Sequence, residues 1–440
     1  MTNPWRRYEN YLLGILLLIL AFNFVDRFAL GLALQDIKTD LALSDTQLGL
    51  ISGIAFAIFY SIMGIPIARW ADRGNRRVIV SLTTLLWSVM VVLCGAVGNF
   101  AQLVLIRIGV GVGEAGCVPT ANSLIADYFD RGQRARASAI YWSGASLGII
   151  IGNLVAGWLD RFYGWRAMFA LLGLPGVVLA ALAFFTLREP RAFTPKPKNS
   201  LPQEFTGAIE RHARPSGKDI VESLCRNATF RYLVLGQSVL YFHSYGVLLW
   251  QPTFFVRSFG LTSGELGTWL ALVLGGTGIL GTYFGGRLFS RYTREDERMQ
   301  LRAATYVFVV VALIAPWTYI APNRYAAFGL IAVTSLGSTS ISGPFLAIIQ
   351  SIVPERMRAT AVAVTFLFAN LIGMGLGPLV TGVLSDTLQA SAGQQSLRYA
   401  LLALTPSYFL VAWLLWRASH MVFGDLLAPS AVEGKAHAKS

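Results

Sequence analysis

The hydrophobic and polar residues of this chain alternate in long blocks rather than in short periods. Twelve mostly apolar stretches are separated by short polar segments, and about 20 apolar residues in a helix are enough to cross the core of a bilayer. We therefore predict an all-α integral membrane protein with twelve transmembrane helices. The predicted limits are 11–35, 46–68, 78–98, 101–126, 136–159, 166–187, 230–255, 264–286, 302–321, 325–351, 359–384 and 398–418.

Composition supports this class and argues against several others. The chain is 55% hydrophobic and only 13% charged, whereas soluble domains carry about 25% charged residues. Cys94, Cys117, Cys225 and the four histidines have no paired or metal-binding spacing, so we expect no disulfide, no metal site and no cofactor. The scattered cysteines and histidines also provide no nucleophile with its base, so we do not expect an enzyme.

The basic residues indicate how the chain is oriented in the membrane. Lys and Arg number 36 against 23 Asp and Glu, but apolar spans separate them and they form no continuous stripe, which argues against nucleic-acid binding. With the N-terminus inside, most of them fall in inner segments, as the positive-inside rule requires. We therefore predict that both termini are cytoplasmic, which also agrees with an even number of spans.

A polar, proline-rich segment divides the chain into two halves. We predict one bundle of six helices over residues 1–190 and a second over 230–422. Residues 191–229 are expected to form a cytoplasmic linker and residues 423–440 a cytoplasmic tail. Within the linker, 218–226 fits both a short amphipathic helix on the membrane surface and a plain solvated segment, and both possibilities stay open.

The two halves resemble each other, which is typical of secondary transporters. The segment Arg134-Ala-Arg136-Ala-Ser-Ala before the fifth span corresponds to Arg356-Met-Arg358-Ala-Thr-Ala before the eleventh. Glycines recur every four or five residues in both of these spans. They fit close packing of helices and, equally, a bendable interface between the halves.

Four charged residues inside predicted spans are the main candidates for function. Asp26 and Arg27 lie in the first span, and Arg107 and Glu114 lie two helical turns apart on one face of the fourth. A charge at bilayer depth costs roughly 2.5 to 3.5 kcal/mol, so it is read first as functional. At 1.5 Å per residue, Asp26 lies between Arg107 and Glu114 in depth, which predicts an Asp26 to Arg107 pair.

This pair suggests a proton switch. A nearby arginine favours the charged form of an acid, whereas burial without one favours the neutral form. Our hypothesis is that Asp26 is the main proton site and Arg107 its switchable partner, with Glu114 as a second acceptor or as the mate of Arg27. A permanent ion pair that only ties the two helices together is the structural alternative.

The glycines next to Glu114 match a nucleotide-binding pattern by chance. Gly111-Val-Gly113-Glu-Ala-Gly116 fits the dinucleotide fingerprint, but no strand precedes it and its context is an apolar helix. Close packing of this helix against a neighbour explains the glycines better.

The segment after the second span carries a family motif. Ala68-Arg-Trp-Ala-Asp72-Arg73-Gly-Asn-Arg76-Arg77 resembles the loop signature of the major facilitator superfamily, with Ser290 at the place of the acid in the second half. This resemblance implies two six-helix bundles and a cytoplasmic gate formed by Asp72, Arg73, Arg76, Arg77 and Arg136. A carboxylate such as Asp72 is favoured near a helix N-terminus, here that of the eleventh span, and a serine does not supply this charge.

The resemblance narrows to one branch of that superfamily. Asn23-Phe-Val-Asp26-Arg27, the stretch from Arg107 to Ala115, and Asp72-Arg73 with Arg76-Arg77 together are similar to the Spinster family. Its members are proton-linked or facilitative carriers working by alternating access, and they carry lysophospholipids or sphingosine phosphate. The short loops and tails are typical of a bacterial member, so the resemblance implies a location in the inner membrane. The partners that it implies are protons, the lipid bilayer and a small amphipathic substrate.

The substrate site is less well defined by the sequence. An apolar second half facing a charged first half would form an amphipathic cavity, in which Arg27 and Arg107 suit an anionic head group. Candidate cavity residues are Phe22, Asn23, Tyr241, His243 and Tyr245. Aromatic residues in spans often serve packing or the interfacial belt, and His243 also fits a core histidine that bonds a neighbouring helix.

Two alternatives stay open. A major facilitator carrier of small organic anions or drugs would have the same fold and the same buried charges, and a non-transporting membrane sensor could be built on this fold. We expect a monomer.

Overall fold

The computed structural model describes residues 4–190, 217–292, 296–354 and 357–427. Almost all of these residues are helical, and the described part of the chain contains no β-strand. Ten helical stretches are long and apolar enough to cross a membrane. Two of them are double, because Arg134–Thr186 turns at Gly164 (φ 78°) and Thr360–Gly424 turns at Gly393 (φ 55°). Counted as two spans each, they give the predicted number of twelve.

In the described part of the first half, residues 4–190, the chain forms seven helices. They are α1 (Pro4–Asp40), α2 (Asp45–Ser52), α3 (Ile54–Arg73), α4 (Arg76–Cys94), α5 (Phe100–Glu114), α6 (Cys117–Tyr128) and α7 (Arg134–Thr186). The second predicted span is broken at Gly53 into α2 and α3, and the fourth is broken after Glu114 into α5 and α6.

The second half repeats this pattern with more breaks. Helix α9 (Gly217–Arg226) precedes it. The elements of this half are α10 (Ala228–Phe259), α11 (Ser263–Leu270), η2 (Ala271–Gly275), α12 (Gly276–Tyr292), α13 (Glu297–Ile320), α14 (Arg324–Ser340), α15 (Ser342–Ser351), α16 (Arg358–Phe368), η4 (Ala369–Leu376), α17 (Gly377–Ala392), η5 (Gly393–Gln395), α18 (Ser396–Leu404) and α19 (Ser407–Leu427).

The proposed linker and tail are only partly described. Residues 191–216 and 428–440 lie outside the described residues. The stretch at 218–226 is helical, as α9, and its residue Leu224 is buried against the second half. Helix α19 continues to Leu427, so the last helix extends into the region expected to be a tail.

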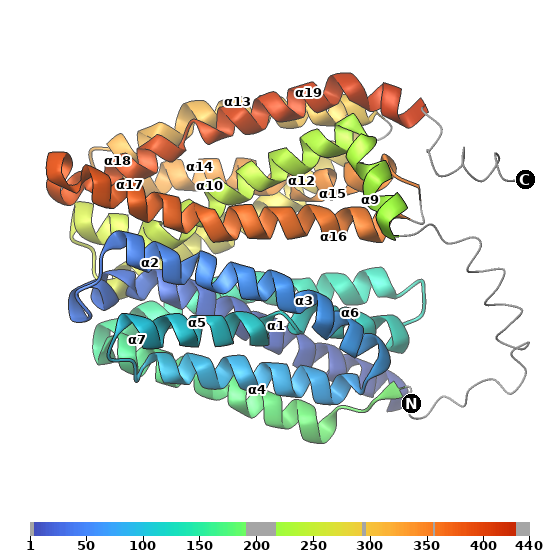
Figure 1. Cartoon of the computed structure of the whole chain (residues 1–440), viewed down its shortest axis with the longest axis horizontal. Helices are drawn as coiled ribbons and strands as arrows, with labels where there is room; N and C mark the ends of the chain where they lie inside the picture. Colours follow the sequence, from blue (N-terminus) through green and yellow to red (C-terminus); the bar gives the residue numbers. More distant parts are fainter. Residues whose placement is uncertain (1–3, 191–216, 293–295, 355–356, 428–440) are drawn as a thin grey trace, which may run out of the picture.

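The helices form two layers (Figure 1). Helices α1 to α7 lie together on one side and α10 to α19 on the other, with α1 packed mainly on α7 and α10 on α19. One hydrophobic core fills the first half and continues into the second through residues such as Trp250 and Phe254, whereas a separate core lies within the second half around Phe308 and Phe345.

The bundle has two chemically different ends. At the basic end, Tyr8 near the start of α1 meets the end of α7, and the α3–α4 turn lies close by. At the opposite end, the last turn of α1, the start of α2, the end of α10 and the end of α17 meet around Asp45. We use these two names below.

Glycines allow close helix contacts within and between the halves. In α7, a Cβ atom at Gly152 would lie 2.9 Å from Val25 Cα of α1, within the same half, whereas one at Gly157 would lie 2.5 Å from the Ser263 carbonyl of the second half. In η4 and α17, Gly373 packs on Tyr241 in the same half and Gly382 packs on Asp45 in the other. The repeated glycines therefore allow close packing within one half at some positions and between the halves at others.

Candidate functional site

Asp26 and Arg107 form a buried pair between α1 and α5. Arg107 Nη1 donates a hydrogen bond to Asp26 Oδ2 at 3.1 Å, and both side chains are only 2% exposed. This is the pair that relative depth along the two spans predicts. Its formation requires α1 and α5 to run antiparallel with these residues at the same level.

Arg27 and Glu114 form a second pair beside the first. Arg27 donates from Nε at 2.9 Å and from Nη2 at 2.6 Å, both to Glu114 Oε2, and the Glu114 side chain is fully buried. Of the two roles expected for Glu114, pairing with Arg27 is therefore realised in this conformation. We call these four residues the charge cluster.

The ring of Phe56 from α3 contacts both guanidinium groups. It lies 5.2 Å from Cζ of both Arg27 and Arg107, within the range of cation–π attraction. Tyr60 stacks on Phe56 and also lies 5.2 Å from Arg27. Helix α3 approaches this closely because a Cβ atom at Gly111 would lie only 2.8 Å from the Phe56 carbonyl.

The other glycines of α5 have the same packing role. A Cβ atom at Gly109 would meet Met90, and one at Gly113 would meet Trp87, each within 2.8 Å. The stretch that matches a dinucleotide fingerprint is thus the contact surface of α5 with α3 and α4.

Each acid of the charge cluster has one oxygen that makes no hydrogen bond. Asp26 Oδ1 and Glu114 Oε1 are buried and have no hydrogen-bond partner among the described residues. The same is true of Arg107 Nε and Asn23 Nδ2. Buried polar atoms are rarely left without a partner, and such atoms mark sites where a further ligand, water or proton acts. Half of the hydrogen-bonding capacity of both acids is therefore open.

Two tyrosines of the second half and one of the first lie near the charge cluster. The hydroxyl groups of Tyr60, Tyr241 and Tyr245 lie within electrostatic reach of one another, and each is within reach of the Arg27 guanidinium. Tyr241 and Tyr245 come from α10, and their rings are 5.7 Å apart. Arg27 is thus the cluster residue that faces the boundary between the halves.

His243 lies apart from this group. It is 3% exposed, and its Nδ1 is 3.1 Å from the Leu404 carbonyl and 2.9 Å from Ser407 Oγ, with its ring against Tyr408. The structure therefore corrects its assignment as a cavity residue: it joins α10 to the last span within the second half. Phe22 is half-buried and packs on the main core.

Arg76 also differs from its expected place in a gate. It is fully buried, donates to Asp127 at 2.6 Å and pairs with Glu189 through its side chain and its backbone N–H. These contacts tie α4 to α6 and to the end of α7, all in the first half, so Arg76 holds one bundle together. Arg77 lies over the Phe184 ring, and Asp72, Arg73 and Arg136 are exposed at the basic end.

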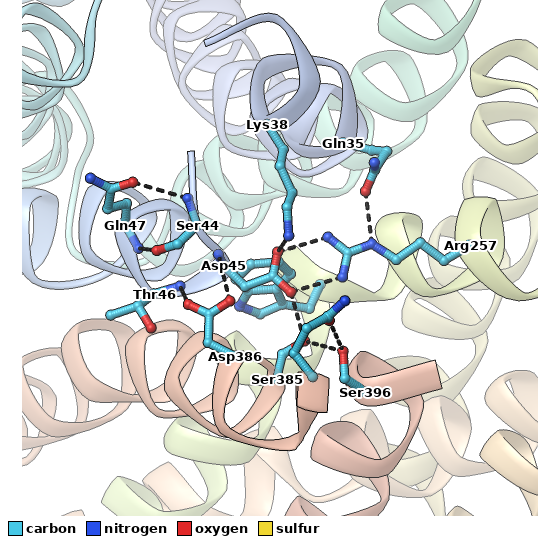
Figure 2. Close-up of polar contacts among 12 residues, drawn as sticks. Gln35, Lys38, Ser44, Asp45, Thr46, Gln47, Arg257, Ser385, Asp386 and Ser396 are labelled. Atoms are coloured by element: carbon cyan, nitrogen blue, oxygen red, sulfur yellow. Dashed lines mark hydrogen bonds and ion pairs between the residues drawn. The ribbon is translucent and has the colours of Figure 1, made fainter. Parts of the chain in front are cut away.

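A polar network that the sequence did not predict lies at the opposite end (Figure 2). Both oxygens of Asp45 are used: Oδ1 accepts from Lys38 at 2.6 Å and from Arg257 at 2.7 Å, and Oδ2 accepts from Arg257 at 2.8 Å and from Ser385 at 2.6 Å. Gln35 accepts a further bond from Arg257. Asp45 therefore joins α1 and α2 of the first half to α10 and α17 of the second.

Asp386 completes this network. We call Lys38, Asp45, Arg257, Ser385 and Asp386 the end latch. The two carboxylate oxygens of Asp386 accept from the backbone N–H groups of Asp45 (3.1 Å) and Thr46 (2.7 Å), the first residues of α2. A carboxylate at a helix N-terminus satisfies free donors and complements the helix dipole. The second half thus caps a helix of the first.

A second corner of the opposite end is closed mainly by packing. Here α7 meets α11 through Gly157 and Gly267, with hydrogen bonds from Trp158 to Thr268 (3.1 Å) and from Arg161 to Thr262 (3.0 Å). Both corners of this end therefore join the two halves.

Two thiols flank the charge cluster. Cys94 and Cys117 are free and buried. Cys94 lies within electrostatic reach of Asp26 and Arg107, and Cys117 within reach of Glu114 and Arg27. Among the described residues no group of three or more His, Cys, Asp or Glu is placed to hold a metal ion.

Comparison with known proteins agrees with this architecture. Residues 16–378 match the family described as Major Facilitator Superfamily. A protein named MFS-type efflux pump from Mycolicibacterium smegmatis is 34% identical over 94% of this chain and 93% of its own length. Protein spinster homolog 1 from Xenopus tropicalis is 28% identical over 91% of this chain and 79% of its own.

A solved structure is similar throughout. It is described as a bacterial homolog of the human lysosomal transporter Spinster in an inward-facing and unoccupied conformation. Its TM-score is 0.83 at 30% identity, and the match covers 98% of this chain and 100% of the other.

Proposed function

Because this chain belongs to the major facilitator superfamily of multi-pass membrane transporters, we propose that it couples proton movement to transport of an amphipathic, lipid-like anion. The substrate class is that of lysophospholipids or sphingosine phosphate. The resemblance to Spinster proteins supports this class. The observation that carries the proposal is the charge cluster, in which two buried acids each keep one oxygen without a hydrogen bond.

Asp26 is the main proton site in this proposal. In the present conformation Arg107 Nη1 lies 3.1 Å from Asp26 Oδ2 and is its counter-ion. If α1 and α5 shift so that this pair separates, Asp26 stays buried without its counter-ion, and the neutral acid becomes favoured. Alternation between the two arrangements then carries one proton across.

Arg27 links the substrate to Glu114. Its guanidinium is bordered by Phe24, Phe56 and Tyr60 and lies near the tyrosines of α10, a setting that suits a phosphate group next to apolar surface. A phosphate that binds Arg27 competes with Glu114 for the same donors. Glu114 then loses its partner and takes up a proton, so substrate binding and protonation favour each other.

Alternating access assigns roles to the two ends. The basic end is cytoplasmic, as are both termini, and residues 1–190 and 230–422 move as two bundles, with residues 191–229 as the cytoplasmic linker in the sequence between them. The end latch and the α7–α11 corner support a state closed at the opposite end and therefore inward-facing, the state named for the similar structure. Asp72, with Arg73, Arg77 and Arg136, forms the gate that closes the cytoplasmic side in the other state.

A second candidate substrate is a small organic anion or a drug. The relative named as an efflux pump supports it, because the same guanidinium groups bind carboxylates as well as phosphates. The protein acts as a monomer in the bacterial inner membrane in either case.

Proton coupling is tested by Asp26→Asn in proteoliposomes, which removes the titratable group and keeps the shape. Uptake driven by an imposed pH gradient is expected to fall at least tenfold, while counterflow without a gradient persists. Asp40→Asn is the matched control, because Asp40 is on the same helix but 46% exposed, and it should behave as wild type. Unchanged gradient dependence in Asp26→Asn would refute the role of Asp26.

The substrate class is tested separately by counterflow with a fluorescent lysophospholipid and competing solutes. Lysolipids and sphingosine phosphate should compete, and Arg27→Gln should abolish competition. If only organic anions or drugs compete, the lipid substrate class is refuted, while the proposed proton coupling is unaffected.

A further inference from the structure

A lateral groove lies on the second half, away from the charge cluster. Its walls come from α12, α13 and α14, and its volume is about 690 Å³. Most of the lining is aliphatic or aromatic, and Phe284, Leu288, Val310 and Leu336 are each at least 40% exposed. The groove is thus an apolar surface that faces the hydrocarbon of the membrane.

One end of the lateral groove is positively charged. Arg287 and Arg291 line it from the last turns of α12, and both are exposed. Residues four apart share a helix face, so Arg287 and Arg291 continue the stripe that Phe284 and Leu288 begin. Both arginines stand in the last two turns of α12, which ends at Tyr292, and this puts the two guanidinium groups near the level of lipid head groups.

A third arginine lies in line on the facing helix. Arg302 of α13 is exposed and stands four and eight residues before Tyr306 and Val310, which line the groove. By helical spacing it lies on the same face, at the basic end. Three arginines from two helices therefore gather where the groove reaches the membrane surface.

The lining contributes no negative charge. None of the groove residues is Asp or Glu, and the sequence has Ser290 where the first half has Asp72. At the start of α13, Asp296 accepts from the backbone N–H of Met299 as a helix cap, and Glu297 lies in the first turn. The repeated motif has thus kept its basic residues in this half without the acid.

We propose that the lateral groove is a binding site for an anionic phospholipid. The phosphate contacts Arg287 and Arg291, with Arg302 nearby, and an acyl chain lies against the apolar walls. Basic sites between transmembrane helices at the membrane surface select anionic head groups, and guanidinium matches phosphate geometry. This site is separate from the transported substrate and does not depend on the proposed coupling mechanism.

The test is lipid titration of the delipidated full chain in detergent, followed by native mass spectrometry. Wild type is expected to bind phosphatidylglycerol more tightly than phosphatidylcholine. The double variant Arg287→Gln/Arg291→Gln should lose about 30-fold in affinity for phosphatidylglycerol, since each basic residue near anionic lipid contributes about fivefold. Arg287→Lys/Arg291→Lys should keep most of the preference, which controls for misfolding.

Two further variants probe the rest of the groove. Val310→Trp should fill the apolar wall and weaken both lipids, whereas Arg324→Gln, at the far end of α14, should leave binding unchanged. Equal affinity of wild type for the two lipids, or an undiminished preference in the Gln double variant, would overturn the proposal. So would light scattering that shows a stable dimer broken by Val310→Trp, because the groove would then bind a second copy.

Discussion

The charge cluster and the end latch use the same chemistry in opposite ways. Both contain buried carboxylates paired with arginine, and in both the acids that pair with arginine come from the first half. Asp45 of the end latch has both oxygens occupied by Lys38, Arg257 and Ser385. Asp26 and Glu114 of the charge cluster each have one occupied oxygen and one without a partner among the described residues.

This difference suits the end latch to holding the two halves together and the charge cluster to changing its protonation state. A carboxylate that accepts several hydrogen bonds from cations and hydroxyls is stabilised in its charged form, so Asp45 keeps its contacts over a wide range of conditions. A buried carboxylate with one free oxygen is less well compensated. The end latch also joins the two halves, whereas all four members of the charge cluster lie in one half. Changes in the latch should therefore move the conformational equilibrium, and changes in the cluster should alter stability and coupling.

The largest expected effect is that of Arg107→Ala on stability. It leaves Asp26 buried without its counter-ion, and removing one partner of a buried pair costs about 3 to 5 kcal/mol. Thermal unfolding in detergent should show a large loss, and the double variant Arg107→Ala/Asp26→Asn should recover much of it. Arg161→Ala serves as the control, because Arg161 is exposed and contacts one hydroxyl and the Trp158 ring but no acid among the described residues. A loss in Arg107→Ala no greater than in the control would mean that the cluster does not need its charges balanced.

The next largest effect is expected for Asp45→Asn. It weakens several bonds to charged groups, each worth about 1.5 to 3 kcal/mol, so the population open at the opposite end should rise at least tenfold. Spin labels at the exposed positions Thr39 and Ala390, with Cys225 replaced by Ser, would report the distance across this end. Asp40→Asn at the same end should not change the distances. Identical distance distributions in Asp45→Asn and wild type would show that the latch does not set this state.

The smallest effect is expected for Ser385→Ala. It removes one hydroxyl donor to Asp45 Oδ2, and the other bonds of that carboxylate remain, so the shift should correspond to about 1 kcal/mol. The same spin-label pair should show a change of about fivefold in population. An effect as large as that of Asp45→Asn would mean that the hydroxyl, rather than the ionic contacts, keeps the end closed.

The charge cluster was predictable from sequence because a charged residue deep in a membrane span is rare and therefore points to a function. The twelve apolar runs define the spans, and Asp26, Arg27, Arg107 and Glu114 are conspicuous because few charges occur within such runs. Relative depth along two antiparallel helices was then enough to pair Asp26 with Arg107.

The end latch carried no such signal. Lys38, Asp45 and Arg257 lie at the ends of apolar runs, where charged residues are ordinary and carry little desolvation cost. Their pairing joins residues more than 200 positions apart, and only the packing of the two halves brings them together. The same limit applied to Arg76, whose motif suggested a gate and whose three-dimensional partners lie within one bundle.

The buried thiols on either side of the charge cluster give the chain its own hydration reporters. Cys94 and Cys117 are shielded in the present state, and a thiol reacts with water-soluble maleimides only when water and reagent reach it. Because each thiol neighbours a different ion pair, its alkylation rate during turnover would report which pair becomes wet, and in which order, without any introduced label.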